Sequence, residues 1–341
     1  MRLSKLLLLV PALPLFGCGS TGGGPVVGAS AGGSPGTPAV LGGPWAPAPP
    51  TAGYTRLTAR TITAVPPGGD VTHCQYLAAP LDRDMDILGV LGYQSQYIHH
   101  ATAFEYTPKA DEPLGNDFQC MGSEFSGDPA SLSQMGPFLG AVGVGGKAST
   151  SSLPDGVSFR HKKGKGIMLS VHVLNTGDMP VDGNAVLDMN MVESEPSRTI
   201  ATMFANVSTN VTLPAAQQTT SVVDCVVRSD LSFLMMGNHM HEYGVKAFTQ
   251  VIRAGGVTED MHTDDTWSND QSFNPVYSSF PLATPLVVHN GDTIRTSCTW
   301  NNSTPNAILF PREMCTASGF ILTPDGSAPM CFNGLWLAQS P

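Results

Sequence analysis

The sequence predicts an all-β protein built from antiparallel β-sandwiches. Short apolar runs rich in Val, Ile, Thr and aromatic residues alternate with Gly, Pro, Asn and Asp, which is the pattern of strands and turns. No long stretch keeps a helical period of apolar residues. The clearest predicted strands are 167–173, 185–191, 219–227, 244–252 and 319–322. Many short strands without helices are typical of sandwiches.

The length allows two domains with a sizeable core in each, because the chain has 341 residues. We place the boundary near the polar segment 194–213, so that the predicted domains are 56–200 and 201–341. The glycine-rich stretch 136–146 is predicted to be a surface loop of the first domain.

The first 18 residues have the pattern of a secretion signal. Arg2 and Lys5 precede the apolar run 6–10, and prolines make this run a poor membrane-spanning helix. The following Leu-Phe-Gly-Cys-Gly resembles a bacterial lipobox, in which Cys18 would carry the lipid. An ordinary signal with an incidental cysteine is the alternative. We expect an exported protein of the bacterial cell envelope, either lipid-anchored (at the outer membrane or the periplasmic face) or secreted.

Residues 19–55 are mostly Gly, Pro, Ala, Ser and Thr. Such a segment cannot bury enough apolar surface to fold, so we predict a disordered tether between the lipid anchor and the body. The body is acidic: the net charge is -10, and the acidic residues begin only at Asp70. This charge argues against nucleic acid as a partner.

The seven cysteines also agree with export from the cell. Without Cys18 six remain, an even number in an exported chain, which predicts three disulfides. Fifteen pairings of six cysteines are possible, and the count alone does not choose among them.

The histidines suggest a metal. His239 and His241 flank Met240, and alternate strand residues face the same side about 7 Å apart. His99 and His100 are adjacent, so both can reach one metal only at a strand end, bend or bulge. His172, in an apolar strand, would by itself be a core histidine. A half-buried strand with a polar face would equally explain His239 and His241.

Met314 is one of fifteen methionines, but its neighbour Cys315 could fix its backbone through a disulfide. The chain therefore offers a nitrogen-only ligand set (His99, His100, His172) and a mixed nitrogen and sulfur set (His239, His241, Met314). A thioether ligand points to copper, and to Cu(I) in particular. The other histidines are expected outside a site: His73 beside Cys74, His161 in the solvated basic turn 160–165, and His262 and His289 in polar loops.

In order along the chain, several segments resemble the copper type II, ascorbate-dependent monooxygenases. That family includes peptidylglycine α-hydroxylating monooxygenase and dopamine β-hydroxylase. The similarity runs from about Cys74 to Cys331. It is carried by His99-His100, Leu153-Pro154-Asp155-Gly156-Val157-Ser158-Phe159-Arg160, Leu169-Ser170-Val171-His172 with Asn175, His239-Met240-His241, Cys298-Thr299-Trp300-Asn301 and Glu313-Met314-Cys315.

The resemblance implies two tandem jelly-roll-like β-sandwiches with two copper ions per chain. His99, His100 and His172 would bind the electron-donating copper, and His239, His241 and Met314 the copper at which O2 and substrate react. It also implies the disulfides Cys74–Cys120, Cys225–Cys331 and Cys298–Cys315. The implied activity is hydroxylation of a C–H bond in a small organic or peptide-like substrate, with ascorbate or another one-electron reductant as co-substrate. We expect a monomer.

Three departures from the peptide-processing relatives concern the substrate. Those enzymes hold the substrate carboxylate with an arginine where this chain has Gly237. They carry asparagine and tyrosine where it has Thr316 and Ser318, and glutamine where it has Ser170. The copper ligands and reaction class are therefore expected here, but a peptide carboxylate is not.

Three other functions stay open on the sequence. The chain could be an exported copper-binding lipoprotein without turnover, or a metal-free adhesive sandwich in which the histidines are structural. A zinc hydrolase fits less well, because Met314 would be an unusual zinc ligand.

Overall fold

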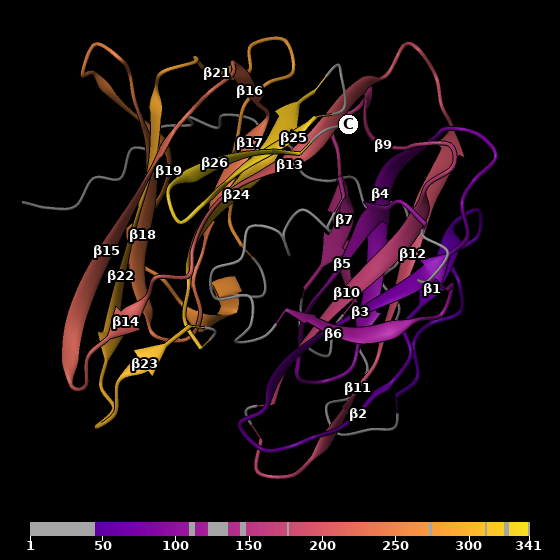
Figure 1. Cartoon of the computed structure of the whole chain (residues 1–341), viewed down its shortest axis with the longest axis horizontal. Helices are drawn as coiled ribbons and strands as arrows, with labels where there is room; N and C mark the ends of the chain where they lie inside the picture. Colours follow the sequence, from indigo (N-terminus) through magenta and orange to yellow (C-terminus); the bar gives the residue numbers. More distant parts are fainter. Residues whose placement is uncertain are drawn as a thin grey trace, which may run out of the picture. The chain divides into compact units, whose positions relative to one another are not determined.

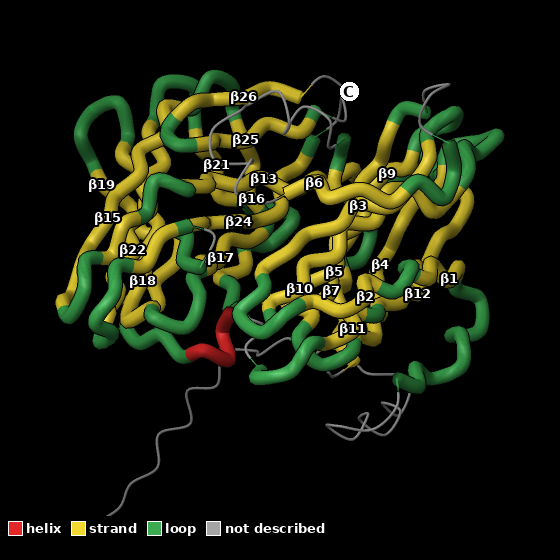
Figure 2. The backbone as a smooth tube through the Cα atoms, turned by 60° about the horizontal axis from the view of Figure 1, so that its bottom comes forward, coloured by secondary structure: helices red, strands yellow, loops and turns green. Residues whose placement is uncertain are grey.

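Strands make up almost all the regular structure of the residues that the computed structural model describes. These residues are 45–108, 113–121, 136–143, 148–175, 177–272, 275–310, 312–323 and 327–339. They belong to one contact unit, residues 36–341. The helical segment named among them is the short turn η2 (Asn269–Ser272), drawn in red among yellow strands in Figure 2. The predicted all-β class is confirmed, whereas the signal peptide, Cys18 and most of the tether lie outside the described residues.

The first half of the chain forms one sandwich (Figure 1). One of its sheets has the order β6 (Asp117–Met121), β3 (Asp70–Ala78), β10 (Gly166–Leu174), β5 (Ile98–Tyr106) and β7 (Phe138–Val142). The facing strands are β1 (Thr55–Thr58), β12 (Ala185–Glu193), β4 (Met85–Gln94) and β9 (Val157–His161), with β8 (Ala148–Ser152) beside β4. Side chains of both layers share one apolar core. Successive strands β3, β4 and β5 alternate between the layers, as in a jelly roll.

The second half repeats this arrangement. One layer has the order β15 (Gln217–Val226), β22 (Thr293–Asn302), β18 (Gly244–Ile252) and β19 (Thr258–Asp264). The other contains β13 (Thr199–Ser208), β24 (Cys315–Leu322), β16 (Leu231–Phe233), β21 (Leu286–Val288), β17 (Met235–His239), β20 (Ser278–Ser279), β25 (Ala328–Phe332) and β26 (Leu335–Gln339). Two buried clusters fill the space between them. The expectation of two tandem antiparallel sandwiches is therefore confirmed.

Two short ladders complete the described part of the fold: β2 (Ile62–Val65) with β11 (Val181–Gly183), and β14 (Thr212–Leu213) with β23 (Ile308–Leu309). The halves are joined where β9 and β13 pair in parallel, so that one 13-stranded sheet runs through both. The boundary predicted between residues 200 and 201 falls inside β13, which pairs with β9 at its start and with β24 from Ala201 onwards. The segment 194–213 is thus largely a strand rather than a polar linker.

The loop predicted at 136–146 is wrong for its described residues. Residues 138–142 form β7, and most of its side chains are buried. The glycines serve close packing: Gly140 has a φ of 149°, and a Cβ there would lie 2.3 Å from Cγ2 of Val90. A glycine-rich segment can therefore be a largely buried edge strand where two layers approach closely.

All three disulfides implied by the resemblance are confirmed. Cys74 pairs with Cys120, Cys225 with Cys331 and Cys298 with Cys315, with Cα–Cα distances of 5.5, 6.1 and 5.8 Å. Disulfides form in oxidising compartments, which agrees with export. None of the helices in the described residues is long and apolar enough to cross a membrane.

Candidate metal site

A β-bulge brings His99 and His100 to the same place. His100 pairs with His172 of β10, but the next pair along is Ile98 with Val173, so His99 is an extra residue in β5. A bulge turns a side chain out of the normal alternation. Adjacent histidines can therefore reach the same neighbours, which is the condition for both of them to bind one metal ion.

Five imidazoles form one cluster, which we call the histidine cluster. Its members are His99, His100, His172, His239 and His241. The His99 ring centroid lies 4.8–5.3 Å from those of the other four. Two trios each place their ligand atoms within 4.8 Å of one another: His99, His100 and His172, and His99, His239 and His241.

His99 belongs to both trios, which differs from the expected pair of separate sites. Its Nε2 lies 3.4 Å from Nε2 of His239. β5 and β10 from the first half therefore meet β17 and its following turn from the second half at one centre. The three histidines of the first predicted set lie together, and so do the two of the second set, but the sequence gave no distance between the sets.

A carboxylate orients His172. Asp70, the first residue of β3, places Oδ1 2.7 Å from Nε2 of His172. The proton on Nε2 is donated to this carboxylate, which leaves Nδ1 as the nitrogen with a free lone pair. A carboxylate behind a ligand imidazole is the usual support of a metal-binding histidine.

His241 is oriented by a backbone carbonyl. Its Nδ1 lies 3.0 Å from the carbonyl oxygen of Arg312, so the ring donates there. Its Nε2 is buried and has no hydrogen-bond partner. A buried lone pair without a donor is costly in a finished structure, and it is the atom that a metal ion would use.

Four of the cluster histidines are held neutral: His99, His100, His239 and His241. Burial, with the neighbouring imidazoles adding repulsion, lowers the pKa of His239 to about 3 and that of His241 to about 4. The same causes place the pKa of His99 and of His100 well below the usual value. Neutral imidazole is the form that binds metals, so little proton release is needed for loading near neutral pH.

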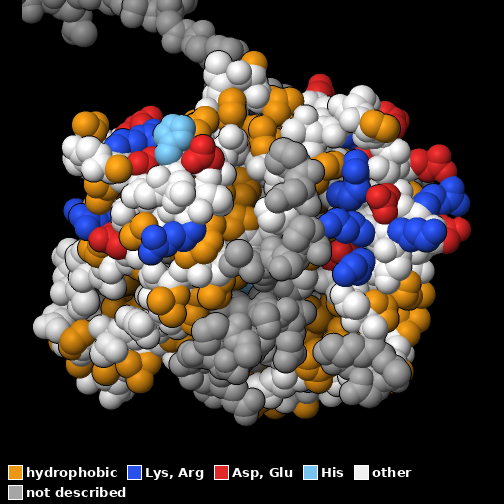
Figure 3. Space-filling model, turned by 45° about the horizontal axis from the view of Figure 1, so that its top comes forward, with side chains coloured by type: hydrophobic (Ala, Val, Ile, Leu, Met, Phe, Trp, Pro, Cys, Tyr) orange, Lys and Arg blue, Asp and Glu red, His pale blue; other side chains and the backbone are white. Residues whose placement is uncertain are grey.

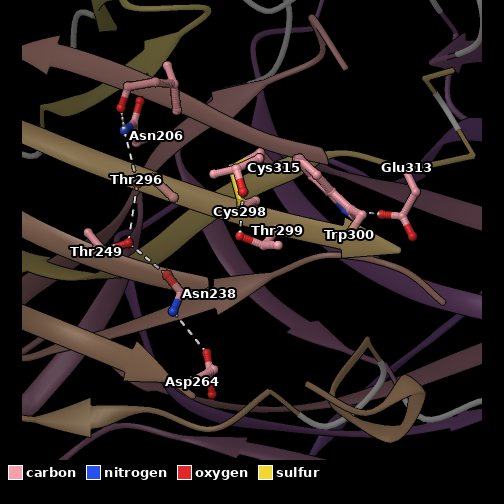
Figure 4. Close-up of a disulfide and its surroundings, with 12 residues drawn as sticks. Asn206, Asn238, Thr249, Asp264, Thr296, Cys298, Thr299, Trp300, Glu313 and Cys315 are labelled. Carbon is pink, nitrogen blue, oxygen red and sulfur yellow. Dashed lines mark hydrogen bonds between the residues drawn. A yellow bond between two sulfur atoms is a disulfide. The ribbon is translucent and has the colours of Figure 1, made fainter. Parts of the chain in front are cut away.

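Glu313 fixes the turn that carries His241. The fully buried carboxylate accepts hydrogen bonds from the backbone N–H groups of His241 and Tyr243 at 2.9 and 2.7 Å, and from Nε1 of Trp300 at 2.9 Å. Figure 4 shows Trp300 pointing at this carboxylate beside the Cys298–Cys315 disulfide. Burial raises the pKa of Glu313 to about 7 against the lowering effect of these donors.

Met314 follows this carboxylate and is half-buried. The two residues before it, Arg312 and Glu313, both contact His241, and Cys315 after it is fixed by a disulfide. Its backbone is thus held next to the second-half histidines, and its role as a ligand stays a prediction.

A ladder of buried polar groups supports His239 from behind. Asn238 donates to Oδ2 of Asp264 at 2.9 Å and accepts from Thr249 at 2.7 Å, while Thr249 and Asn206 both contact Thr296. Figure 4 shows these side chains in a row across the second sandwich. Because Asn238 points into this sandwich, His239 points out of it, towards the first half.

Two histidines predicted in solvated loops are buried instead. His161 ends β9 with no exposed surface, and its Nδ1 lies 3.0 Å from Oε2 of Glu105. His262 lies in β19, between Oγ of Ser278 at 2.9 Å and Oδ2 of Asp264 at 3.2 Å. Both predictions were wrong because each imidazole contacts a buried carboxylate: that of Glu105, 56 residues before His161, and that of Asp264, on the same strand as His262.

The remaining two histidines lie outside the cluster, as predicted. His73 contacts Asp117 at 2.7 Å, and His289, of which 62% is exposed, contacts Asp230 at 3.4 Å. On the face in Figure 3, cationic and anionic side chains are intermixed and histidine covers one small patch. The cluster histidines contribute little surface because they are buried or half-buried.

No protein-family model and no curated protein matches the chain. Solved structures with some likeness include the major capsid protein P2 from bacteriophage PM2, with 8% identity and a TM-score of 0.33 over 80% of this chain and 99% of that one. PBCV-1 VP54 has 6% identity and a TM-score of 0.32 over 89% of this chain and 100% of that one. The STIV MCP has 10% identity and a TM-score of 0.27 over 79% and 97%. Scores this low carry no argument about fold or function.

Proposed function

We propose that the chain is an exported copper-dependent monooxygenase that hydroxylates a C–H bond of a small organic substrate, using O2 and a one-electron reductant such as ascorbate. The observation that carries the proposal is the meeting of five imidazoles from both halves of the chain. The reaction class is taken from the motifs that resemble the copper type II, ascorbate-dependent monooxygenases.

The residues fit copper. His241 Nε2 is a buried lone pair without a donor, and the protons of His241 and His172 are held on their other nitrogens by Arg312 and Asp70. Imidazole alone would suit zinc, iron or nickel as well, and Met314 is what favours copper. Bound copper would supply one-electron redox chemistry and O2 binding.

The protein's own part is to orient and to shield. The bulge at His99 and the strand pairing of His100 with His172 hold one trio, and Glu313 holds the turn of His241. Burial of His99 and His241 keeps bulk water away from these ligands. Such shielding protects reactive species from side reactions.

The test is metal analysis of the purified protein together with O2 uptake in the presence of ascorbate and a panel of substrates. We expect copper to be retained and O2 consumption to be coupled to hydroxylated product. Retained copper without coupled product would favour the copper-binding protein without turnover. A chain that retains no copper at neutral pH would overturn both.

For location, the three disulfides support an oxidising compartment, and we propose a lipid anchor at Cys18. Mass spectrometry of the N-terminal peptide from the native host tests the anchor: an unmodified Cys18, or cleavage elsewhere, would contradict it.

A further inference from the structure

Ser278, His262 and Asp264 form a chain of side-chain contacts that shares no residue with the histidine cluster. Oγ of Ser278 lies 2.9 Å from Nδ1 of His262, and Nε2 of the same ring lies 3.2 Å from Oδ2 of Asp264. The serine belongs to β20, and the other two residues belong to β19. A hydroxyl, an imidazole and a carboxylate in this order are the groups of a nucleophilic triad, which is recognised by geometry rather than by sequence position.

Two amides fix the carboxylate of this chain. Nδ2 of Asn238 donates to Oδ2 of Asp264, and Nε2 of Gln271 donates to Oδ1, both at 2.9 Å. Figure 4 shows Asn238 pointing at Asp264. Because both oxygens accept hydrogen bonds, the carboxylate is held in one orientation beside the imidazole of His262.

The carboxylate selects the tautomer of His262. A lone pair on Nε2 would face a carboxylate oxygen at 3.2 Å and be repelled, so the ring proton is placed on Nε2. Nδ1 then carries the lone pair and accepts the proton of the Ser278 hydroxyl. The Nε2 contact is longer than an ideal hydrogen bond, which is common for such contacts in the absence of substrate. The ring is thus oriented as a general base towards the serine.

The serine reaches the surface, whereas the two residues behind it do not. His262 and Asp264 are buried, and Ser278 is half-buried. Val276 and Tyr277, which precede the serine, are 54% and 40% exposed. A substrate therefore approaches the hydroxyl from solvent and places a short apolar chain on these two side chains, while the imidazole stays shielded from water.

We propose that Ser278 is the nucleophile of a second, metal-independent site that hydrolyses esters of short apolar acyl groups. Oγ of Ser278 forms a bond to the acyl carbon while its proton passes to Nδ1 of His262. The C–O bond of the ester then breaks, and the alcohol leaves with this proton. Water enters by the same steps in place of the alcohol, which releases the acid and restores the serine. Ser278 and His262 are catalytic residues, and Asp264 is a positioning residue.

A fluorophosphonate tests the nucleophile, because it reacts with a serine whose hydroxyl is activated by a neighbouring base. The full chain, freed of metal by a chelator, is treated with an alkyl fluorophosphonate and digested, and the adduct is located by mass spectrometry. We expect one adduct per chain, on Ser278, and none when the chain is first unfolded in guanidinium. Ser278→Ala should abolish the adduct and the hydrolysis of p-nitrophenyl butyrate. Ser279→Ala, at the exposed neighbouring serine, should change neither.

Two further variants test the base and its orientation. His262→Gln should slow the labelling of Ser278 at least about 100-fold, and Asp264→Asn should slow it at least about tenfold. NMR of the imidazole nitrogens in ¹⁵N-labelled protein reads the positioning role directly. In the natural protein His262 should carry its proton on Nε2, and in Asp264→Asn this preference should be lost.

No adduct on Ser278, an adduct on another residue instead, or equal labelling of the unfolded chain would overturn the site. A His262→Gln protein that reacts as fast as the natural protein would also overturn it. The natural protein decides the question even where a variant fails to fold, since the adduct and its loss on unfolding require no substitution. Copper content and O2 uptake play no part in these measurements, so a failure here leaves the proposed function untouched.

Discussion

Oδ1 of Asp70 lies 2.7 Å from Nε2 of His172, so this contact occupies one of the two ring nitrogens of a histidine in the cluster. The carboxylate comes from the start of β3, about one hundred residues before the histidine it supports. His241 is oriented in the opposite sense, through Nδ1 and the Arg312 carbonyl. The two halves thus offer different nitrogens to a metal, Nδ1 from His172 and Nε2 from His241.

Asp70→Ala should lower copper affinity about 10–100-fold, the usual effect of removing the partner of a ligand imidazole. Chelator competition measures the affinity, and the EPR spectrum of the Cu(II) form should change as His172 reorients. Asp70→Asn keeps an acceptor for the Nε2 proton and should restore most of the affinity. Asp117→Ala breaks the similar 2.7 Å contact with His73, outside the cluster, and serves as control. Equal losses in Asp70→Ala and Asp117→Ala would contradict the assignment.

Replacing His99, the histidine shared by the two trios, should affect metal binding by both trios. Because His99 belongs to both trios, His99→Ala should reduce retained copper more than His100→Ala or His239→Ala, each of which leaves one trio whole. Copper per chain after dialysis against a chelator is the measurement. His289→Ala, on the surface, is the control. If the three cluster variants lose the same amount of copper, His99 contributes no more to copper binding than His100 or His239.

Met314→Leu removes the thioether and keeps the volume. We expect Cu(I) affinity, measured by competition with a chromogenic chelator, to fall while the copper held by His99, His100 and His172 is retained. X-ray absorption should show one sulfur neighbour in the natural protein and none in the variant. Met203→Leu, a half-buried methionine packed against the first core, is the control. Unchanged copper content, affinity and sulfur signal would make Met314 a packing residue.

The sequence predicted which histidines lie close together better than it predicted the loops, for physical reasons. Histidines are few in this chain, so their order and spacing were informative. The bulge at His99 was required by chemistry, since adjacent residues in a regular strand point apart, and the structure has it. The closeness of His99 to His239 could not be predicted, because it depends on how the two halves pack.

Buried polar residues were the main source of error. The sequence around His161 is basic, which favours a solvated turn, yet Glu105 on β5 of the facing sheet binds the imidazole inside the core. Glu313 was recognised within a motif, but its three N–H partners from distant segments were visible only in the fold.

Glu313→Gln should destabilise the second sandwich. A glutamine amide would place one N–H2 group against donors that now face carboxylate oxygens, at a cost of about 2–4 kcal/mol. Denaturant unfolding of the metal-free, disulfide-intact protein, followed by Trp fluorescence, measures the change. Glu242→Gln, an exposed neighbour paired with Arg312, should cost less than about 1 kcal/mol. A Glu313→Gln protein as stable as Glu242→Gln would mean that the buried donors have other partners.

Asp188 should make the first sandwich sensitive to acid. Its buried carboxylate accepts from Nε and Nη2 of Arg56 at 2.6 and 2.8 Å and from Thr51 at 3.0 Å. Burial opposes ionisation, but these hydrogen bonds outweigh it and lower the pKa of Asp188 below its usual value. Its folded pKa is therefore below its unfolded pKa. The resulting stabilisation is present above about pH 4 and is lost as the pH falls through the folded value.

Asp188→Asn should accordingly lower the unfolding free energy near pH 7 by about 2 kcal/mol and flatten its decline below pH 4. Guanidinium unfolding at a series of pH values, with the disulfides intact, compares it with the natural protein. Asp224→Asn removes a carboxylate that pairs with Arg295 on the surface, so it should leave both the free energy and its pH profile nearly unchanged. If Asp188→Asn instead declined in acid as steeply as the natural protein, Asp188 would not be the source of the acid sensitivity.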